Sequence, residues 1–126
     1  MREFLFRGKK TGTNEWIYGS LISICGKSYI EEQVRLSKSY DVDSDTVGQY
    51  TGLKDKNGVK IFESDICVNS DKDNYPRPLS VEWIEEFACF AFVDKGDFNN
   101  MYFYQKNHME NVAVIGNIHD NKELLK

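Results

Sequence analysis

The chain has 126 residues, of which 40% are hydrophobic and 29% are charged, and its formal net charge at neutral pH is −4. A chain of this length fits one domain that buries enough surface to fold without disulfides or metal ions. The frequent aromatic residues exclude a disordered chain, and the acidic balance argues against bulk binding to phosphate backbones.

The cysteines and the apolar segments indicate the cellular compartment of the protein. There are three cysteines at wide spacings, without a C-x-x-C pair. Cys25, Cys67 and Cys89 lie among apolar or β-branched neighbours, so we expect buried free thiols in a reducing compartment. The N-terminus lacks the sustained apolar region of a signal peptide, and no apolar run is long enough to span a membrane. We therefore expect a cytoplasmic protein without membrane contact.

The start of the chain alternates short apolar segments with polar turns, as antiparallel strands do. Residues 2–8 are predicted to form a strand with Phe4 and Phe6 on one face. Residues 15–24 are predicted to form a second strand, in which Gly19 indicates a bulge or the close approach of another backbone.

A hairpin is predicted over residues 21–31, with its tight turn at Gly26-Lys27. Residues 31–39 leave two alternatives open, one or two helical turns or a surface loop, because their apolar pattern is short. Residues 40–42 are predicted as a short strand. Asp43 or Ser44 is expected to cap a single helical turn after it.

Residues 47–68 are the most strongly patterned stretch of the chain. The pair Asn57-Gly58 is the strongest hairpin signal, because both residues tolerate positive φ. A second turn is predicted at Ser64-Asp65, followed by a short apolar strand. The stretch therefore reads as structural, without a recognisable reacting group.

The second half of the chain continues the pattern of strands and turns. Residues 69–78 hold both prolines and are predicted as the longest loop, where mobility is most expected. The predicted strands are residues 79–84, 87–93, 101–104 and 111–116. Asp120 is predicted to cap a short C-terminal helix. Closely spaced strands with turns between them indicate a small barrel or sandwich with little helix.

No pattern of residues indicates a catalytic or metal site. Asp41, Asp43 and Asp45 alternate like the start of a calcium loop, but Thr46 stands where that loop needs glycine and Gly52 where it needs glutamate. Two histidines without paired thiols argue against a zinc site. We therefore predict no cofactor and no enzymatic activity.

Four residues are candidates for contact with a partner. Trp16 and Tyr18, at positions i and i+2, share one face of a predicted strand. Such aromatics can stack on nucleic-acid bases or anchor a protein interface, and the simpler interpretation is that they pack the core of a small barrel. Lys54 and Lys56 are displayed beside the predicted hairpin and are the other two candidates.

Three segments of the sequence also carry a resemblance. They are residues 6–9 with 15–21, residues 43–68, and residues 114–125, and the second contains the run VGQYTGLKDKNG. Read together, these segments resemble the YopX family of phage and prophage proteins. The likeness runs from end to end in the family's order, and the central run nearly matches the family signature.

The chain departs from the family pattern at a few positions. The family commonly has Gly-Asp in the turn where this chain has Ser64-Asp65. It often has tyrosine where this chain has Phe62 and His119, and proline where this chain has Lys122. These differences affect turn geometry and packing, and they leave the resemblance intact.

The resemblance implies a small β-rich protein encoded by a phage or prophage of Gram-positive bacteria. It implies one YopX-like domain over residues 1–126, with N-terminal strands over residues 1–46 and an SH3-like small barrel over residues 47–126. It also makes a homo-oligomer an expectation. It supplies no catalytic residues and no cofactor.

These observations lead to three hypotheses of unequal weight. We expect a non-enzymatic accessory protein that binds itself or another protein. The alternative is a nucleic-acid-binding regulator of phage or host genes, which the acidic total disfavours. Its contact set would be Arg2, Arg7, Lys9, Lys10, Lys54, Lys56 and Lys60. An enzyme with a site scattered through the sequence is the least favoured.

Overall fold

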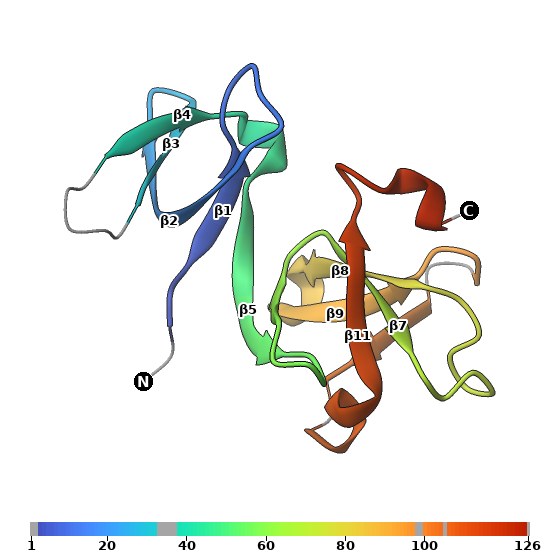
Figure 1. The fold of residues 1–126 in the computed structure, drawn as a ribbon. Helices are drawn as coiled ribbons and strands as arrows, with labels where there is room; N and C mark the ends of the chain where they lie inside the picture. Colours follow the sequence, from blue (N-terminus) through green and yellow to red (C-terminus); the bar gives the residue numbers. More distant parts are fainter. Residues whose placement is uncertain (1–2, 33–37, 98–99, 105, 126) are drawn as a thin grey trace. The chain divides into compact units, whose positions relative to one another are not determined.

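The structure, a computed structural model, describes residues 3–32, 38–97, 100–104 and 106–125 (Figure 1). Its contacts divide the chain into two compact units, Met1–Gly52 and Leu53–Lys126. The central part of the segment 31–39, for which the sequence left helical turns and a loop open, lies outside the described residues, as does Arg2.

The first unit is an antiparallel sheet with one 3-10 turn. Its elements are β1 (Phe6–Lys9), β2 (Trp16–Ile24), β3 (Lys27–Glu31), β4 (Ser39–Val42), η1 (Ser44–Thr46) and β5 (Gly48–Lys54). The strands lie in the order β4-β3-β2-β1-β5, and β6 (Lys60–Phe62) continues the sheet after β5. The chain leaves this unit along β5, whose last residues belong to the second unit.

The predicted hairpin between β2 and β3 is present, with its turn one residue earlier than expected. Cys25 and Gly26 are the turn residues, with φ values of 50° and 78°, and Ile24 pairs with Lys27. Positive φ at both central residues is what a two-residue turn needs to match the strand twist. Cys25 is therefore exposed at the turn, so the expectation that it is buried was wrong.

Gly19 is the point of close backbone approach that the sequence indicates. An added Cβ would overlap the carbonyl oxygen of Glu31 and lie 2.8 Å from its carbonyl carbon. The core beside this crossing consists of Ile17, Ile30 and Val42, which are 2%, 0% and 3% exposed. Strands β2, β3 and β4 meet around this core.

The second unit is also antiparallel. Its elements are β6 (Lys60–Phe62), β7 (Asp65–Asn69), β8 (Leu79–Ile84), η2 (Glu85–Phe87), β9 (Cys89–Asp94), β10 (Asn100–Phe103), η3 (Lys106–Asn111), β11 (Val112–Asn117) and η4 (Lys122–Leu125). Strands β7 to β10 form a meander, and β11 returns to pair with β7, so the sheet order is β10-β9-β8-β7-β11 (Figure 1). Its buried cluster is Ile61, Cys67, Leu79, Val81, Phe92 and Val112.

The predicted mainly β fold with little helix is confirmed, since the helical segments of the described chain are all short 3-10 turns. After the four-strand meander, a fifth strand, β11, follows the 3-10 turn η3 and pairs with β7, a strand order that SH3-like barrels share. The predicted closed small barrel is not formed: in the described residues the edge strands β10 and β11 each pair on one side only.

One predicted strand begins later than expected. The sequence predicts a strand over residues 87–93, whereas β9 begins at Cys89 because Glu85 to Phe87 form η2 and Ala88 takes a left-handed φ of 51°. A left-handed residue ends a helical turn and redirects the chain. Phe87 is thereby displaced from the sheet and becomes 57% exposed.

The proline-containing loop between β7 and β8 is held at both ends. The Asn69 side chain accepts the backbone N–H of Asp71 at 2.9 Å. Arg77 Nε donates to both carboxylate oxygens of Asp94, at 3.0 and 3.2 Å, and Asp94 is 1% exposed. This hydrogen bond raises the pKa of the Arg77 guanidinium. The loop therefore has fixed attachment points to the sheet.

The C-terminal segment forms a 3-10 turn where a capped helix was expected. The carboxylate of Asp120 accepts a hydrogen bond from Asn117 Nδ2 at 3.2 Å. The Asn117 side-chain oxygen in turn accepts the backbone N–H groups of His119 and Asp120, each at 3.0 Å. Asn117 therefore organises this turn, because its amide satisfies local backbone groups as Asx turns do.

Candidate functional site

The patterned stretch 47–68 contains two buried carboxylates, and that of Asp55 holds its central turn. Its Oδ1 accepts the backbone N–H groups of Asn57 at 2.8 Å and Val59 at 2.9 Å. Its Oδ2 accepts the N–H of Val114 at 2.9 Å, from a residue 59 positions further along the chain. Asp55 is 6% exposed. It therefore fixes its own turn and also ties that turn to β11.

The electrostatics of Asp55 match this structural role. Burial on its own raises the pKa of the carboxyl, but the N–H groups of Val114, Val59 and Asn57 and the charge of Lys56 outweigh it and hold the pKa below its ordinary value. A carboxyl that stays ionised at neutral pH and whose oxygens are occupied by backbone N–H groups is a poor general acid or base. The central stretch therefore serves the fold.

The turn at Asn57-Gly58 has a different form from the one expected. Only Gly58 takes a positive φ, of 80°, and its N–H donates to the Asp55 carbonyl at 3.0 Å. The Asp55 N–H donates to the Val59 carbonyl at 2.8 Å. This is the geometry of a three-residue loop that ends in a left-handed glycine.

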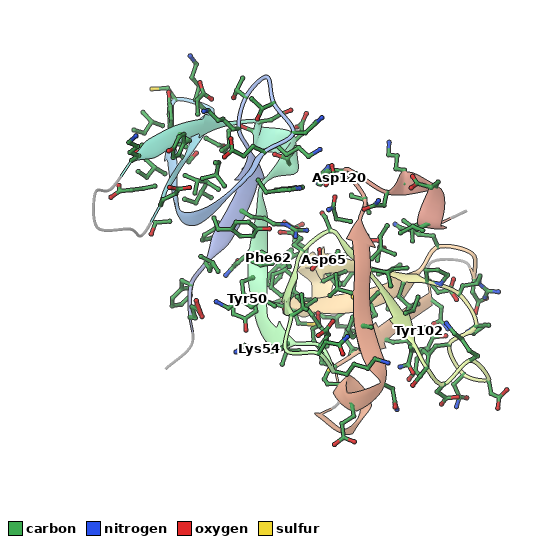
Figure 2. The ribbon with its side chains drawn as sticks, in the orientation of Figure 1. Tyr50, Lys54, Phe62, Asp65, Tyr102 and Asp120 are labelled. Atoms are coloured by element: carbon green, nitrogen blue, oxygen red, sulfur yellow. The ribbon has the colours of Figure 1, made fainter. Side chains whose placement is uncertain are left out.

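The candidate contact residues Lys54 and Lys56 flank this turn. Both side chains are exposed, and Lys54 is labelled in Figure 2. The backbone N–H of Lys56 donates to the Val112 carbonyl at 2.9 Å, which adds a second tie between the turn and β11. The turn therefore presents both ammonium groups from a fixed backbone.

The candidates Trp16 and Tyr18 lie on the face of β2 opposite to the core of the first unit. Lys9 pairs with Trp16 and Arg7 pairs with Tyr18 across β1 and β2. The Arg7 guanidinium carbon lies 4.7 Å from the Trp16 ring centroid, and Lys9 Nζ lies 5.6 Å from it. The interpretation that these aromatics pack the core is therefore wrong: they form a cation–aromatic face, with Tyr18 45% exposed.

Exposed aromatics gather at one end of the second unit, where β8 turns into β9. Phe87 in η2 and Phe103 at the end of β10 are 57% and 45% exposed, and their ring centroids are 5.5 Å apart in an edge-to-face arrangement. Trp83 and Phe90 make a similar contact at 5.1 Å. We call the pair Phe87 and Phe103 the aromatic rim. Trp83 and Phe90 lie on the other face of the sheet, because Phe103 pairs with Ala91 whereas Trp83 pairs with Phe90.

A groove of about 320 Å³ lies beside Trp83 in the same unit. Its lining includes Glu63, Ser64, Glu82, Trp83, Lys95 and Ile118. Glu82 Oε2 accepts both Lys95 Nζ at 2.7 Å and the Ser80 hydroxyl at 2.8 Å. The exposed indole of Trp83 and this ion pair therefore give the groove one apolar and one charged wall.

Among the described residues, His, Cys, Asp and Glu form no group of three or more that could hold a metal ion. The alternating aspartates have local structural partners instead. The Asp41 carboxylate accepts a hydrogen bond from the Thr11 hydroxyl at 3.0 Å, and that of Asp43 accepts the N–H of Asp45 at 3.4 Å as the cap of η1. Of the two predicted caps, Asp43 and Ser44, the structure therefore uses Asp43.

The three thiols differ in exposure, and this difference predicts their reactivity. Cys67 is buried in the core, and burial raises the pKa of its thiol, whereas Cys25 is exposed in its turn and Cys89 is half-buried. Since the thiolate is the reactive form, we expect one fast thiol in the native protein and all three after denaturation. Titration with a chromogenic disulfide checks this, and Cys25→Ser should remove the fast phase. A fast phase that persists in this variant would contradict the assignment.

Both the sequence and the fold of the chain are similar to those of known proteins. The model of the family described as "YopX protein" matches residues 5–126. The chain belongs to the YopX family. A crystal structure of protein EF1440 from Enterococcus faecalis is similar to this YopX chain, with a TM-score of 0.64 and 26% identity, and all of each chain is covered. No curated protein matches the chain.

The structure explains one departure of this YopX protein from the family pattern. Ser64 takes a left-handed φ of 76°, which favours the glycine that the family commonly has at this position. The next residue, Asp65, is 2% exposed, and its Oδ2 accepts the N–H of Phe62 at 2.7 Å (Figure 2). The turn therefore keeps its left-handed geometry in this chain without glycine.

The sequence did not indicate the aromatic rim or the groove of this YopX protein. The sequence pattern made Phe87 the first residue of a strand and placed Trp83 on one strand face with Leu79 and Val81. One signal pointed the other way: Glu85-Glu86 before Phe87 is a polar pair at which a strand can stop. The described part of the chain also contains no helix long and apolar enough to cross a membrane.

Proposed function

We propose that this YopX protein is an accessory protein of a phage or prophage that acts by binding and not by catalysis. Its partner is a second copy of the chain or another protein in the cytoplasm of the bacterial host. The three free cysteines support a reducing compartment. The family match and the likeness to protein EF1440 support the family assignment on which the phage origin rests.

One observation carries the proposal, the exposed contact between Phe87 and Phe103. Two large aromatic side chains, 57% and 45% exposed, pack on each other at the surface of the second unit. Large exposed apolar patches on soluble proteins mark interaction sites, and aromatic residues are enriched at protein interfaces. The aromatic rim is therefore the surface that we assign to protein contact.

The test is the change Phe87→Ser. We expect this variant to lose the self-association or partner binding of the wild type while its thermal unfolding stays close to wild type, since Phe87 lies outside the core. Size-exclusion chromatography with light scattering measures the first, and pull-down from infected cells measures the second. Ile24→Ser, at a residue 56% exposed in the first unit, is the matched control.

Two outcomes would count against this assignment. A wild type that is strictly monomeric and retrieves no partner from infected cells contradicts binding as the function. Equal loss of association in Ile24→Ser and Phe87→Ser would show that general surface hydrophobicity, and not the aromatic rim, drives the contact.

The cation–aromatic face of the first unit favours a second candidate, a nucleic-acid-binding regulator. Lys9 and Trp16 are the pairing of charge and ring that base and phosphate contacts use. Arg7, however, is only 6% exposed, which removes one cation from the accessible set. A gel-shift assay at low salt with single- and double-stranded nucleic-acid probes tests this candidate function. The absence of a shift under these conditions would rule it out.

A further inference from the structure

Strand β8 is longer than its pairing with β7. In the described chain, β7 pairs with β8 at Leu79 and Ser80, whereas β9 pairs with it from Ser80 to its last residue, Ile84. Past the end of β7, the N–H of Ser64 donates to the Val81 carbonyl at 2.8 Å. The remaining residues of β8 therefore have a sheet neighbour on one side.

The direction of the Val81 carbonyl identifies the open backbone groups. In an antiparallel sheet the N–H and C=O of one residue point to the same side, and alternate residues point the same way. Because Val81 points away from β9, Trp83 also directs its N–H and C=O away from β9. No described strand pairs with Trp83 on that side. An unpaired stretch of this kind is a template for another strand.

The groove lies against this edge and its walls suit a strand. Trp83 is 46% exposed, and Glu82, on the opposite face of β8, has a side chain that is 35% exposed. Lys95 and the Ser80 hydroxyl both bind Oε2 of Glu82, and the structure gives Oε1 no partner among the described residues. An added strand would thus meet an aromatic ring and a carboxylate oxygen at successive positions.

We propose that this groove binds an extended segment of a partner protein, which adds to the open edge of β8 as a further strand. Its side chain opposite Trp83 is β-branched, and its neighbouring side chain opposite Glu82 is cationic. Main-chain hydrogen bonds to Trp83 supply the binding energy, and the alternating side chains supply the selectivity. This inference rests on the proposed function, because it takes the second unit as the binding part.

Charge complementarity selects the cationic partner. Residues 53–126 contain thirteen Asp and Glu against nine Lys and Arg, so this part carries the whole net charge of −4. Glu85 and Glu86 are exposed directly after β8. A segment with alternating β-branched and basic residues therefore meets carboxylates, and one with acidic residues is repelled.

The experiment is a titration of the full chain, labelled with ¹⁵N, with two capped five-residue peptides. One alternates valine with arginine and the other alternates valine with glutamate. We expect the arginine peptide to shift the Trp83 amide signal and slow its hydrogen exchange, while the Glu82 and Ile84 amides, already paired with β9, exchange as before. The glutamate peptide should bind about two- to fivefold more weakly.

Two variants and one modified peptide test the contacts. Glu82→Gln keeps an acceptor for the Ser80 hydroxyl and should remove the preference for arginine. Trp83→Ala should weaken the arginine peptide several-fold, whereas Ile115→Ala, at a residue 41% exposed on β11, should not. N-methylation of the peptide backbone on its β8-facing side should abolish binding.

Three results would overturn the proposal: no change at the Trp83 amide with peptide in the low millimolar range, changes confined to another surface, or equal binding of both peptides. Running Phe87→Ser in the same titration separates the two assignments. If Phe87→Ser binds the peptide and still associates normally, the assignment of the aromatic rim is refuted and the strand site stands. If Phe87→Ser loses association and the wild type binds neither peptide, the strand site is refuted and the assignment of the aromatic rim stands.

Discussion

Replacing Asp55 by asparagine should destabilise the second unit by about 2 kcal/mol or more. The amide keeps one oxygen for the N–H groups of Asn57 and Val59, but its NH₂ group faces the N–H of Val114, which loses its acceptor. A buried donor left without a partner costs its full desolvation penalty. Urea unfolding followed by fluorescence measures the change, and Asp73→Asn, at an exposed loop position, is the matched control. Equal midpoints for wild type and Asp55→Asn would contradict this.

The Asp55 carboxyl also determines how the stability of the fold changes with pH. Because the pKa of Asp55 is lowered in the folded protein, its ionised form stabilises the fold above the unfolded pKa of about 3.9. That contribution is lost as pH falls through the lower, folded pKa. The stability gap between wild type and Asp55→Asn should therefore be full at pH 7 and shrink in acid below about pH 4. A gap that widens in acid would be inconsistent with a lowered pKa.

Gly19→Ala should disrupt the first unit, at a cost of about 3 kcal/mol or more. The new Cβ would overlap backbone atoms of Glu31, and backbone in a paired strand cannot move aside as a side chain can. The β2–β3 pairing, in which Ser20 lies opposite Glu31, must shift. Circular dichroism and thermal unfolding measure the loss.

The matched control for this change is Gly12→Ala. Gly12 has a φ of 76° and nothing within 4 Å of an added Cβ, so alanine there meets only the left-handed backbone penalty of about 1–2 kcal/mol. A larger effect at Gly12 than at Gly19 would mean that backbone conformation, and not the crossing of strands, decides tolerance in this unit.

Local chemistry made part of this fold predictable. Gly19 indicated the close approach of another backbone, because glycine inside a strand often marks such a contact. Asp43 was recognisable as a helix cap because its side-chain oxygen can accept a backbone N–H. The turn at Asn57-Gly58 was located correctly, although only Gly58 takes the positive φ. In each case the deciding atoms lie within a few residues of each other.

The remaining features depend on partners far apart in the sequence. The bond from Val114 to Asp55 joins residues 59 positions apart, and no local pattern marks which N–H reaches a buried carboxylate. Ala88 looks like a strand residue, yet its left-handed conformation places Phe87 outside the sheet. Trp83 follows the alternating pattern of a buried strand face, but β8 extends past the end of β7, so Trp83 lies at an open edge of the sheet. The candidate groove and the aromatic rim therefore needed the tertiary structure.

The pairing of β11 with β7 has a consequence for synthesis on the ribosome. The first unit is contiguous in sequence, so its strands can pair while the rest of the chain is still being made. The second unit is different, because β11 completes its sheet and also supplies the Val114 N–H to Asp55. The turn at the centre of the family signature is therefore completed only after β11 has been synthesised. A nascent chain that stalls before β11 would expose β7 along the side that β11 covers in the finished protein.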